Sequence, residues 1–391
     1  MSLQSVRNSV TESMAGIILP CGLVMLLTGM FWVGAHSLFP KIYSFGVALP
    51  TLVLILAQPT IVRSVLRSPT IALFLTFSVF LLISLAWASP EVSGASLATR
   101  PFLVLLLFIA IREVGLRYPD RFDRAIQVSV AIAVLSAIYT LARFVMEGAV
   151  GRLSGYGALY NPLLVSHVFG FFAALCAGFY FSDRRLFLPL PLIATLLLAV
   201  LLLATGSRTP LMAFTATLLW LAMLRLDRKA VICVGILIGI GVVVIALWPD
   251  ILLQRGASYR PQIWTEALRQ IAENPWFGHG FNTPIYIQLS DIGYPFREPH
   301  NLVLAVIYSV GIIGGAIWLL MYGVALGSAW RARGQAGIIV YSAPVVYGFV
   351  AGLTEGGAFL SRPKEHWFLI WIPLALLALA IDRGSRDKKT C

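Results

Sequence analysis

Residues 186–205 read LFLPLPLIATLLLAVLLLAT, an apolar run without a charged side chain. A run of about 20 apolar residues can cross the roughly 30 Å hydrocarbon core of a bilayer as a helix. Similar runs recur along almost the whole chain, which has 391 residues, 59% of them hydrophobic and 12% charged, and a mean hydropathy of +0.87. So few charges cannot cover a soluble protein of this length, and the sequence therefore predicts an all-α, polytopic integral membrane protein.

The apolar runs predict about twelve transmembrane helices. Nine of them, connected by short loops, occupy residues 1–249, and a large outer loop follows at 250–299. The last three and a terminal tail occupy residues 300–391. The predicted spans are 14–34, 42–58, 70–88, 100–114, 124–147, 161–182, 186–205, 209–225, 230–249, 300–327, 336–354 and 367–382.

The basic residues predict the orientation of these spans. If the N-terminus is cytoplasmic, 18 of the 29 Lys and Arg residues fall on the inner side, and every inner connection is basic. Both termini are then cytoplasmic, and the large loop lies outside. The net charge of +12 is explained by this topology and by contact with anionic membrane lipid, so nucleic acid is not predicted as a partner.

The large loop contains one segment with helical periodicity, at residues 258–273. Pro261 suits a first turn, and the Asn274-Pro275 pair ends the helix. We expect this amphipathic helix to lie along the outer membrane surface. The apolar residues at helical spacing are Ile263, Trp264, Ala267, Leu268 and Ile271.

Basic residues on the outer side do not serve the topology and are therefore candidates for function. Arg269 precedes Glu273 by four residues, which favours an ion pair on the loop helix. Lys41, Arg362 and Lys364 flank helix ends, where snorkelling explains them. The full outer set is Lys41, Arg100, Arg143, Arg152, Arg208, Arg255, Arg260, Arg269, Arg297, Arg362 and Lys364.

Arg152, Arg208 and Arg260 stand in local sequence that positions them. Arg208 occupies a tight turn in which Thr209 is expected to cap the eighth span and Pro210 to open it. Arg152 lies in a Gly-rich run shortly before a second helix start on the same side. Outward helix starts and guanidinium groups together predict a binding site for a polyanion such as a pyrophosphate. For each arginine alone, contact with a lipid headgroup is the alternative. The other two outward helix starts are Asn161-Pro162 and Pro299-His300-Asn301.

His300 is the outstanding titratable residue, because it lies where the large loop meets a span, two residues after Glu298. A neutral imidazole can accept a proton near pH 7, which makes His300 a candidate general base or ligand contact, with a structural role as the alternative. His279 reads as a turn residue. The outer side has no Asp-x-Asp pair, no His cluster at metal-ligand spacing and no phosphate loop, so neither a metal nor another cofactor is predicted.

Three segments of the large loop and the following span resemble the signature region of the O-antigen ligase and polymerase superfamily. They are the run from Arg260 to Leu268, the turn from Asn274 to Gly280, and Pro299-His300-Asn301 with the glycines at 311–315. The Gly206-Ser207-Arg208 turn is similar to the Ser-Arg turn of that family. A length near 400 residues with no added soluble domain resembles the ligase branch.

The resemblance implies a GT-C-like, metal-independent, inverting glycosyltransferase of the bacterial inner membrane with its active site facing the periplasm. Its donor would be O-antigen linked to undecaprenyl pyrophosphate, and its acceptor a sugar hydroxyl of lipid A-core. Carried over by position, His300 matches the catalytic histidine, and Arg208 and Arg260 match the essential arginines. Arg152 joins them through charge placement, with Glu298, Asn301, Trp264 and Asn161 as supporting residues.

Two other functions remain open. An O-antigen polymerase performs the same chemistry with another growing glycan as acceptor, and no acceptor-reading motif excludes it. A lipid-linked glycan flippase or transporter would also need outer arginines, but it should show internal repeats or deeply placed charges, and the sequence has neither.

Overall fold

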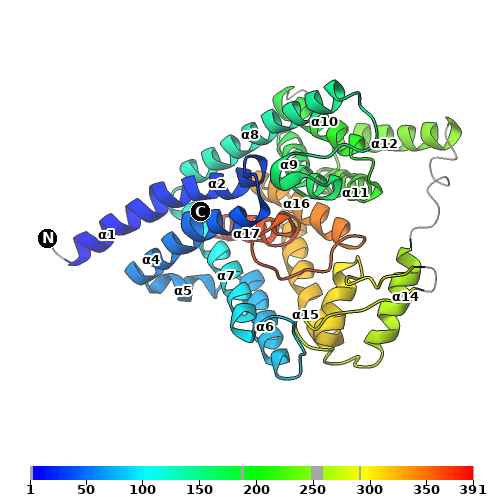
Figure 1. The fold of residues 1–391 in the computed structure, drawn as a ribbon. Coiled ribbons are helices and arrows are strands. Elements are labelled where there is room, and N and C mark those ends of the chain that lie inside the picture. Colours follow the sequence, from blue (N-terminus) through cyan, green and yellow to red (C-terminus); the bar gives the residue numbers. More distant parts are fainter. Residues whose placement is uncertain (1–2, 186–188, 248–258, 290–291, 391) are drawn as a thin grey trace.

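The chain is helical, with irregular connections between the helices. The computed structural model describes residues 3–185, 189–247, 259–289 and 292–390 (Figure 1). Within these ranges the one β-bridge joins Ile287 to Phe296 in the large loop, and the predicted all-α class is confirmed. Arg255 and Ser258, the first residue of the predicted loop helix, lie outside the described residues.

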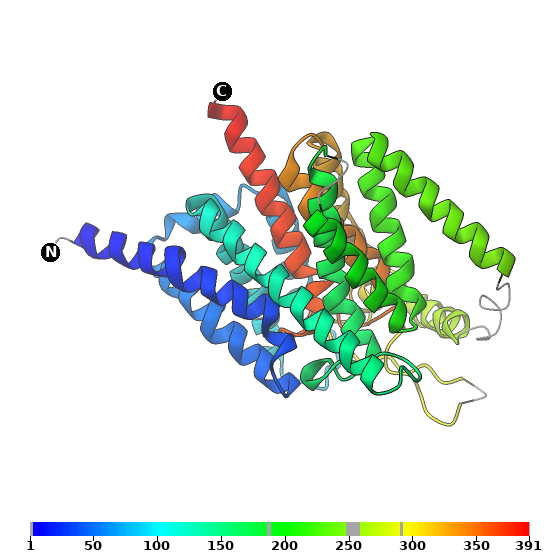
Figure 2. The same cartoon turned by 90° about the horizontal axis from the view of Figure 1, so that it is seen from above.

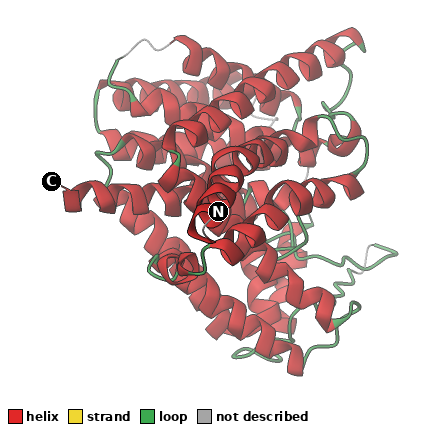
Figure 3. Cartoon of the chain, turned by 90° about the vertical axis from the view of Figure 1, so that its left-hand side faces the viewer, coloured by secondary structure: helices red, strands yellow, loops and turns green. Residues whose placement is uncertain are grey.

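Helices account for most of the described chain, and in Figure 3 the green loops lie at the periphery of the red helices. Two π-helical turns and several 3₁₀ turns extend or join the α-helices. The α-helices are α1 (Leu3–Ser13), α2 (Leu19–Thr28), α3 (Phe39–Tyr43), α4 (Leu49–Ala57), α5 (Thr60–Val65), α6 (Pro69–Ile83), α7 (Gly94–Arg117), α8 (Pro119–Met146), α9 (Pro162–Ser182), α10 (Pro189–Ala204), α11 (Arg208–Arg225), α12 (Arg228–Leu247), α14 (Arg260–Ile271), α15 (Leu302–Arg331), α16 (Ala336–Gly352) and α17 (Trp371–Thr390).

Each predicted span coincides with a helix, so the multi-pass character is supported. Eight of the predicted spans match the long apolar stretches named at the end of this paragraph, and the other four match α10, α11, α12 and α16. The number of actual crossings stays a prediction. Among the described residues, 8 helical stretches are long and apolar enough to cross a membrane: Arg7–Phe31, His36–Ala57, Pro69–Ala86, Gly94–Arg117, Pro119–Met146, Pro162–Ser182, Leu302–Arg331 and Glu365–Arg386.

The predicted inner connections meet at one end of the helix bundle. Arg112 Nε contacts Asp382 Oδ2 at 2.6 Å, and its Nη1 donates to Ser64 Oγ at 2.6 Å. Arg383 Nη2 donates to the carbonyl of Gly115 at 2.9 Å. In Figure 2 the N-terminus lies at the left and the C-terminus at the top, whereas α14 and the yellow loop after it lie at the lower right. The large loop is therefore far from both termini, and the orientation of the bundle in the membrane stays a prediction.

Three helices, α9, α16 and α17, pack tightly together at the centre of the bundle, and the connection at 353–364 joins two of them. Tyr347 of α16 lies against Gly170 of α9 and donates its hydroxyl hydrogen to the carbonyl of Ser166 at 2.8 Å. A Cβ on Gly348 would lie 1.7 Å from the carbonyl oxygen of Leu369. Small residues let the helix backbones approach closely, which is how helices without a hydrophobic driving force pack in lipid. This core holds the 353–364 connection in place.

The orientation can be tested by labelling. A cysteine introduced at Ser154 is expected to react in intact cells with a membrane-impermeant thiol reagent that crosses the outer membrane, because this exposed residue lies in a connection predicted to be periplasmic. A cysteine at Arg228, which is also exposed, should react only after the inner membrane is opened. The parent protein gives the background from its own cysteines. Labelling at position 228 in intact cells would reverse the predicted orientation.

Candidate active site

The start of α15 holds His300 at the junction of the large loop and the bundle. Asn301 is the N-cap, and its Oδ1 accepts hydrogen bonds from the N–H groups of Val303 at 2.9 Å and Leu304 at 3.1 Å. These two donors would otherwise lack partners in the first turn. His300 has a φ of 47°, in the left-handed region that residues with a Cβ adopt at a cost. A strained, capped turn therefore positions this histidine.

A break in α15 anchors the large loop. Gly311 adopts a φ of 66° inside the helix, which frees carbonyl groups of the preceding turn. The N–H groups of His279 and Gly280 donate to the carbonyls of Tyr308 at 2.8 Å and Ser309 at 2.9 Å. A Cβ on Gly311 would lie 2.2 Å from the loop backbone, so only glycine permits this approach. The Gly-x-Gly turn of the loop is thus bonded into the helix that begins after His300.

His279 has a structural role, as its turn-like sequence context predicts. Its ring stacks on Tyr308 with centroids 4.4 Å apart, and Nε2 lies 2.9 Å from the carbonyl oxygen of Gln270. These contacts connect α14, the loop and α15.

The predicted loop helix is confirmed as α14, but its apolar face packs differently from the expectation. Ile263, Ala267 and Ile271 are buried against Tyr308 and the loop after α14, instead of facing lipid. Trp264 is half-buried in the same cluster. Protein contacts therefore bury most of the α14 face that was expected to lie on the membrane surface. The first residue of α14, Arg260, lines a cavity described next.

The three arginines selected from the sequence line one cavity. Arg152, Arg208 and Arg260 surround a space of about 290 Å³ together with Glu355, Leu163 and the turn at 206–209. Arg208 is exposed, and its guanidinium forms no ion pair or hydrogen bond with another residue in the described ranges. Three guanidinium groups facing one carboxylate leave an excess of positive charge. This arrangement can bind a polyanion.

Arg152 supports the turn that presents Arg208. Its Nε donates to the carbonyl of Thr205 at 2.9 Å, and its Nη2 donates to Ser207 Oγ. The predicted capping role of Thr209 is wrong: α11 begins at Arg208 with Ser207 as N-cap, and the Thr209 hydroxyl instead bonds Thr354 Oγ1 at 2.9 Å. The helix starts two residues earlier than a Thr209 cap would place it, and the Ser207 hydroxyl accepts from Arg152 instead of capping the helix.

Glu355 is the residue of this site that sequence reasoning missed. It is 5% exposed, lies just after α16 and forms an ion pair with Arg260. Burial raises the pKa of Glu355 above its ordinary value, and the nearby charges of Arg260 and His300 offset part of that increase. An acidic residue followed by two glycines on the outer side was the available sequence signal.

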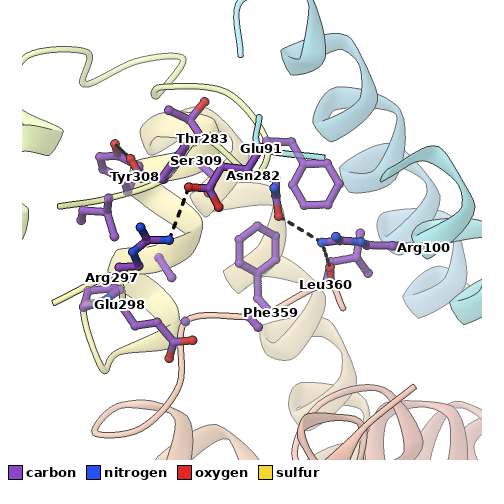
Figure 4. Close-up of a pocket in the computed structure, with 17 residues that line it drawn as sticks. Glu91, Arg100, Asn282, Thr283, Arg297, Glu298, Tyr308, Ser309, Phe359 and Leu360 are labelled. Carbon is purple, nitrogen blue, oxygen red and sulfur yellow. Dashed lines mark hydrogen bonds and ion pairs between the residues drawn. The ribbon is translucent and has the colours of Figure 1, made fainter. Parts of the chain in front are cut away.

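Glu298 and Pro299, directly before His300, border a second cavity of about 210 Å³ (Figure 4). Glu298 lies against Gly357, where an added Cβ would meet its Cβ at 3.2 Å. His300 itself lines neither cavity: it directly follows Glu298 and Pro299, which border the second one, and its ring meets that of Phe296 edge-on with centroids 6.3 Å apart. The loop segment that ends at His300 therefore borders the second cavity and, through Glu298 and Gly357, contacts the connection that supplies Glu355 to the first.

The remaining predicted residues have structural partners. Asn161 caps α9, with its Oδ1 accepting from the N–H of Leu163 at 2.8 Å. Arg269 bonds Glu273 at 3.0 Å, which confirms the predicted pair, and also Glu266 at 2.8 Å. His366, which no motif singles out, is buried and bonds Glu365 at 2.9 Å.

Metal ligands do not gather in the site. Within the described ranges no three His, Cys, Asp or Glu side chains form a group that could hold a metal ion. The cavity with Arg152, Arg208 and Arg260 offers cationic donors in their place.

Comparison with known proteins gives two similarities. Residues 193–319, which include Arg208, Arg260 and His300, match the O-antigen ligase family. The chain is also 44% identical over 375 residues to a protein of Pseudomonas aeruginosa named O-antigen ligase, with 96% of this chain and 93% of that protein covered.

Proposed function

Because this chain belongs to the O-antigen ligase family, an enzyme family of lipopolysaccharide biosynthesis, we propose that it transfers O-antigen from undecaprenyl pyrophosphate to a sugar hydroxyl of lipid A-core. The reaction takes place on the periplasmic side of the bacterial inner membrane. The observation that carries the proposal is the cavity in which Arg152, Arg208 and Arg260 converge beside a single carboxylate.

The arginine cavity binds the pyrophosphate of the donor. Arg208, which has no partner in the described protein, and Arg260 offer planar guanidinium groups that match phosphate oxygens in bidentate geometry. Glu355 holds Arg260 in the cavity before the donor binds. The charge that develops on the leaving pyrophosphate is stabilised by these cations, without a requirement for a metal ion.

His300 acts as the general base. The acceptor hydroxyl attacks the anomeric carbon of the donor sugar and gives its proton to the neutral imidazole. The new bond joins the acceptor oxygen to the anomeric carbon, while the bond from that carbon to the phosphate oxygen breaks and its electron pair leaves with undecaprenyl pyrophosphate. Attack opposite to the leaving group inverts the anomeric centre. The position of His300, directly after Glu298 and Pro299 at the border of one cavity, supports this role.

A reconstituted reaction tests the function. Purified protein, undecaprenyl-pyrophosphate glycan and lipid A-core are incubated with EDTA, and the lipopolysaccharide is separated by size. We expect lipid A-core to shift to glycan-bearing forms even with EDTA present. Extension of only the lipid-linked chain would identify a polymerase instead. Movement of the lipid-linked glycan across vesicles without any new glycosidic bond would identify a transporter.

A further inference from the structure

The second cavity is built by six segments at one end of the bundle. It is lined by the connection before α7, the start of α7, two stretches of the large loop, the first turns of α15, and the connection after α16. Figure 4 shows Arg100, Asn282 and Phe359 on one side and Glu91, Arg297 and Glu298 on the other. Such convergence of distant segments is typical of a ligand site on a rigid scaffold.

The charges of this cavity are balanced, in contrast to the arginine cavity. Arg297 pairs with Glu91 at 3.4 Å, and Glu298 adds a second carboxylate. Arg100 Nη1 donates to Asn282 Oδ1 at 3.2 Å and to the carbonyl of Leu360 at 3.3 Å. Two arginines facing two carboxylates give no excess positive charge, so the cavity does not favour a second pyrophosphate.

The lining instead combines apolar rings with hydrogen-bonding groups. Phe281 and Phe359 lie with ring centroids 6.1 Å apart, and the Arg100 guanidinium is 5.7 Å from the Phe281 ring centroid. Carboxylate, amide and guanidinium groups supply both acceptors and donors at the rim. A sugar ring presents the matching surface, because its C–H face is apolar and its edge carries hydroxyl groups.

The cavity lies next to the segment that carries His300, the proposed base. Glu298 and Pro299 border the cavity and directly precede His300. Ala305 and Tyr308, in the helix α15 that begins two residues after His300, also line it. The connection after α16 supplies Glu355 to the arginine cavity and Gly357, Phe359 and Leu360 to this one, so the two cavities are neighbours along that connection. A hydroxyl held in the second cavity would therefore lie beside the segment that carries the proposed base.

We propose that this cavity, lined by Phe281, Asn282, Arg297, Glu298 and Phe359, binds the terminal sugar of the acceptor glycolipid. The inference rests on the proposed function, and it assigns donor and acceptor to two different cavities. Asn282 and Glu298 then bind the acceptor sugar above the buried rings of Phe281 and Phe359, while Arg152, Arg208 and Arg260 bind the donor.

Kinetics with each substrate varied in turn test the assignment. Ala358→Phe fills the cavity, and Asn282→Gly removes a polar group from its wall while tolerating the left-handed backbone of this position, whose φ is 64°. Each is expected to raise the KM for lipid A-core about tenfold, the effect of losing roughly 1.4 kcal/mol of binding, and to leave the KM for the lipid-linked donor unchanged. Arg269→Ala, which removes an exposed ion pair on α14, is the control that should change neither KM.

The outcomes separate this inference from the proposed function. If the wild-type protein forms no ligated product, the proposed function fails. If it does, but both variants leave the KM for lipid A-core unchanged or raise the KM of the donor, the acceptor cavity is wrong and the ligase assignment remains.

Photochemical capture provides a measurement without turnover. A benzoylphenylalanine replaces Arg297, whose side chain is 64% exposed at the rim of the cavity, so that folding is preserved. Irradiation is expected to crosslink lipid A-core, whereas the same probe at Leu163, which lines the arginine cavity, should capture the undecaprenyl-pyrophosphate glycan. The reverse pattern would overturn the assignment, as would equal capture of both substrates at position 297.

Discussion

Replacing His300 with alanine is expected to lower turnover by about 100-fold to 10,000-fold, the usual contribution of a positioned general base. Affinity for the lipid-linked donor should change little, because the proposed pyrophosphate site is the arginine cavity, which His300 does not line. Single-turnover ligation and donor binding measured side by side check the two halves of this expectation.

Backbone strain at His300 requires a matched variant. With a φ of 47° this position is unfavourable for alanine, whereas asparagine tolerates left-handed backbone well. His300→Asn therefore keeps the turn while removing the base, and it should lose as much turnover as His300→Ala. Substantial activity in the asparagine variant alone would mean that the histidine acts through the shape of the turn.

The pH dependence separates a base from a cationic clamp. Only the neutral imidazole accepts a proton, so the wild-type rate should rise with pH across about pH 5 to 8, where histidine side chains generally titrate. His300→Asn should lose this rise. A histidine that instead gripped the pyrophosphate as a cation would give weaker donor binding in the variants and a rate that declines over the same range.

The helices could be predicted from sequence because each one is marked by its own apolar run. Their ends were less predictable: the span expected at 100–114 belongs to a helix from Gly94 to Arg117. Hydropathy reports the part of a helix that lipid surrounds, whereas backbone hydrogen bonding continues into the interface. The face of α14 was misassigned for a related reason, since periodicity shows that Ile263 and Ile271 need burial but not whether protein or lipid covers them.

The site was predictable where charge broke the topological pattern. Arg152, Arg208 and Arg260 stood out as basic residues on the outer side, and the structure brings them together. Glu355 did not stand out, because its significance lies in a contact with Arg260, 95 residues away in the chain. No local pattern encodes such a pair. The Thr209 error has the same origin, since its hydroxyl bonds Thr354, 145 residues away in the chain, instead of capping the helix.

The second large effect is expected at the arginine cavity. Arg208→Ala should reduce ligation by about 100-fold to 1,000-fold, the range seen when one group that stabilises a developing negative charge is removed. Folding should not suffer, because this guanidinium has no partner within the described part of the chain. Arg208→Lys should restore little, since an ammonium cannot grip two phosphate oxygens in one plane.

Arg260→Ala requires a companion variant, because it also leaves the buried carboxyl of Glu355 without its cation. In the double variant Arg260→Ala, Glu355→Gln the uncompensated charge is gone, so thermal stability should recover while ligation stays low. Recovery of ligation together with stability would show that Arg260 serves the fold and not the pyrophosphate. The control is Arg269→Ala, which loses an exposed ion pair on the same helix and should ligate at the normal rate. If Arg208→Ala and the double variant also ligate at near-normal rates, the arginine cavity does not bind the pyrophosphate.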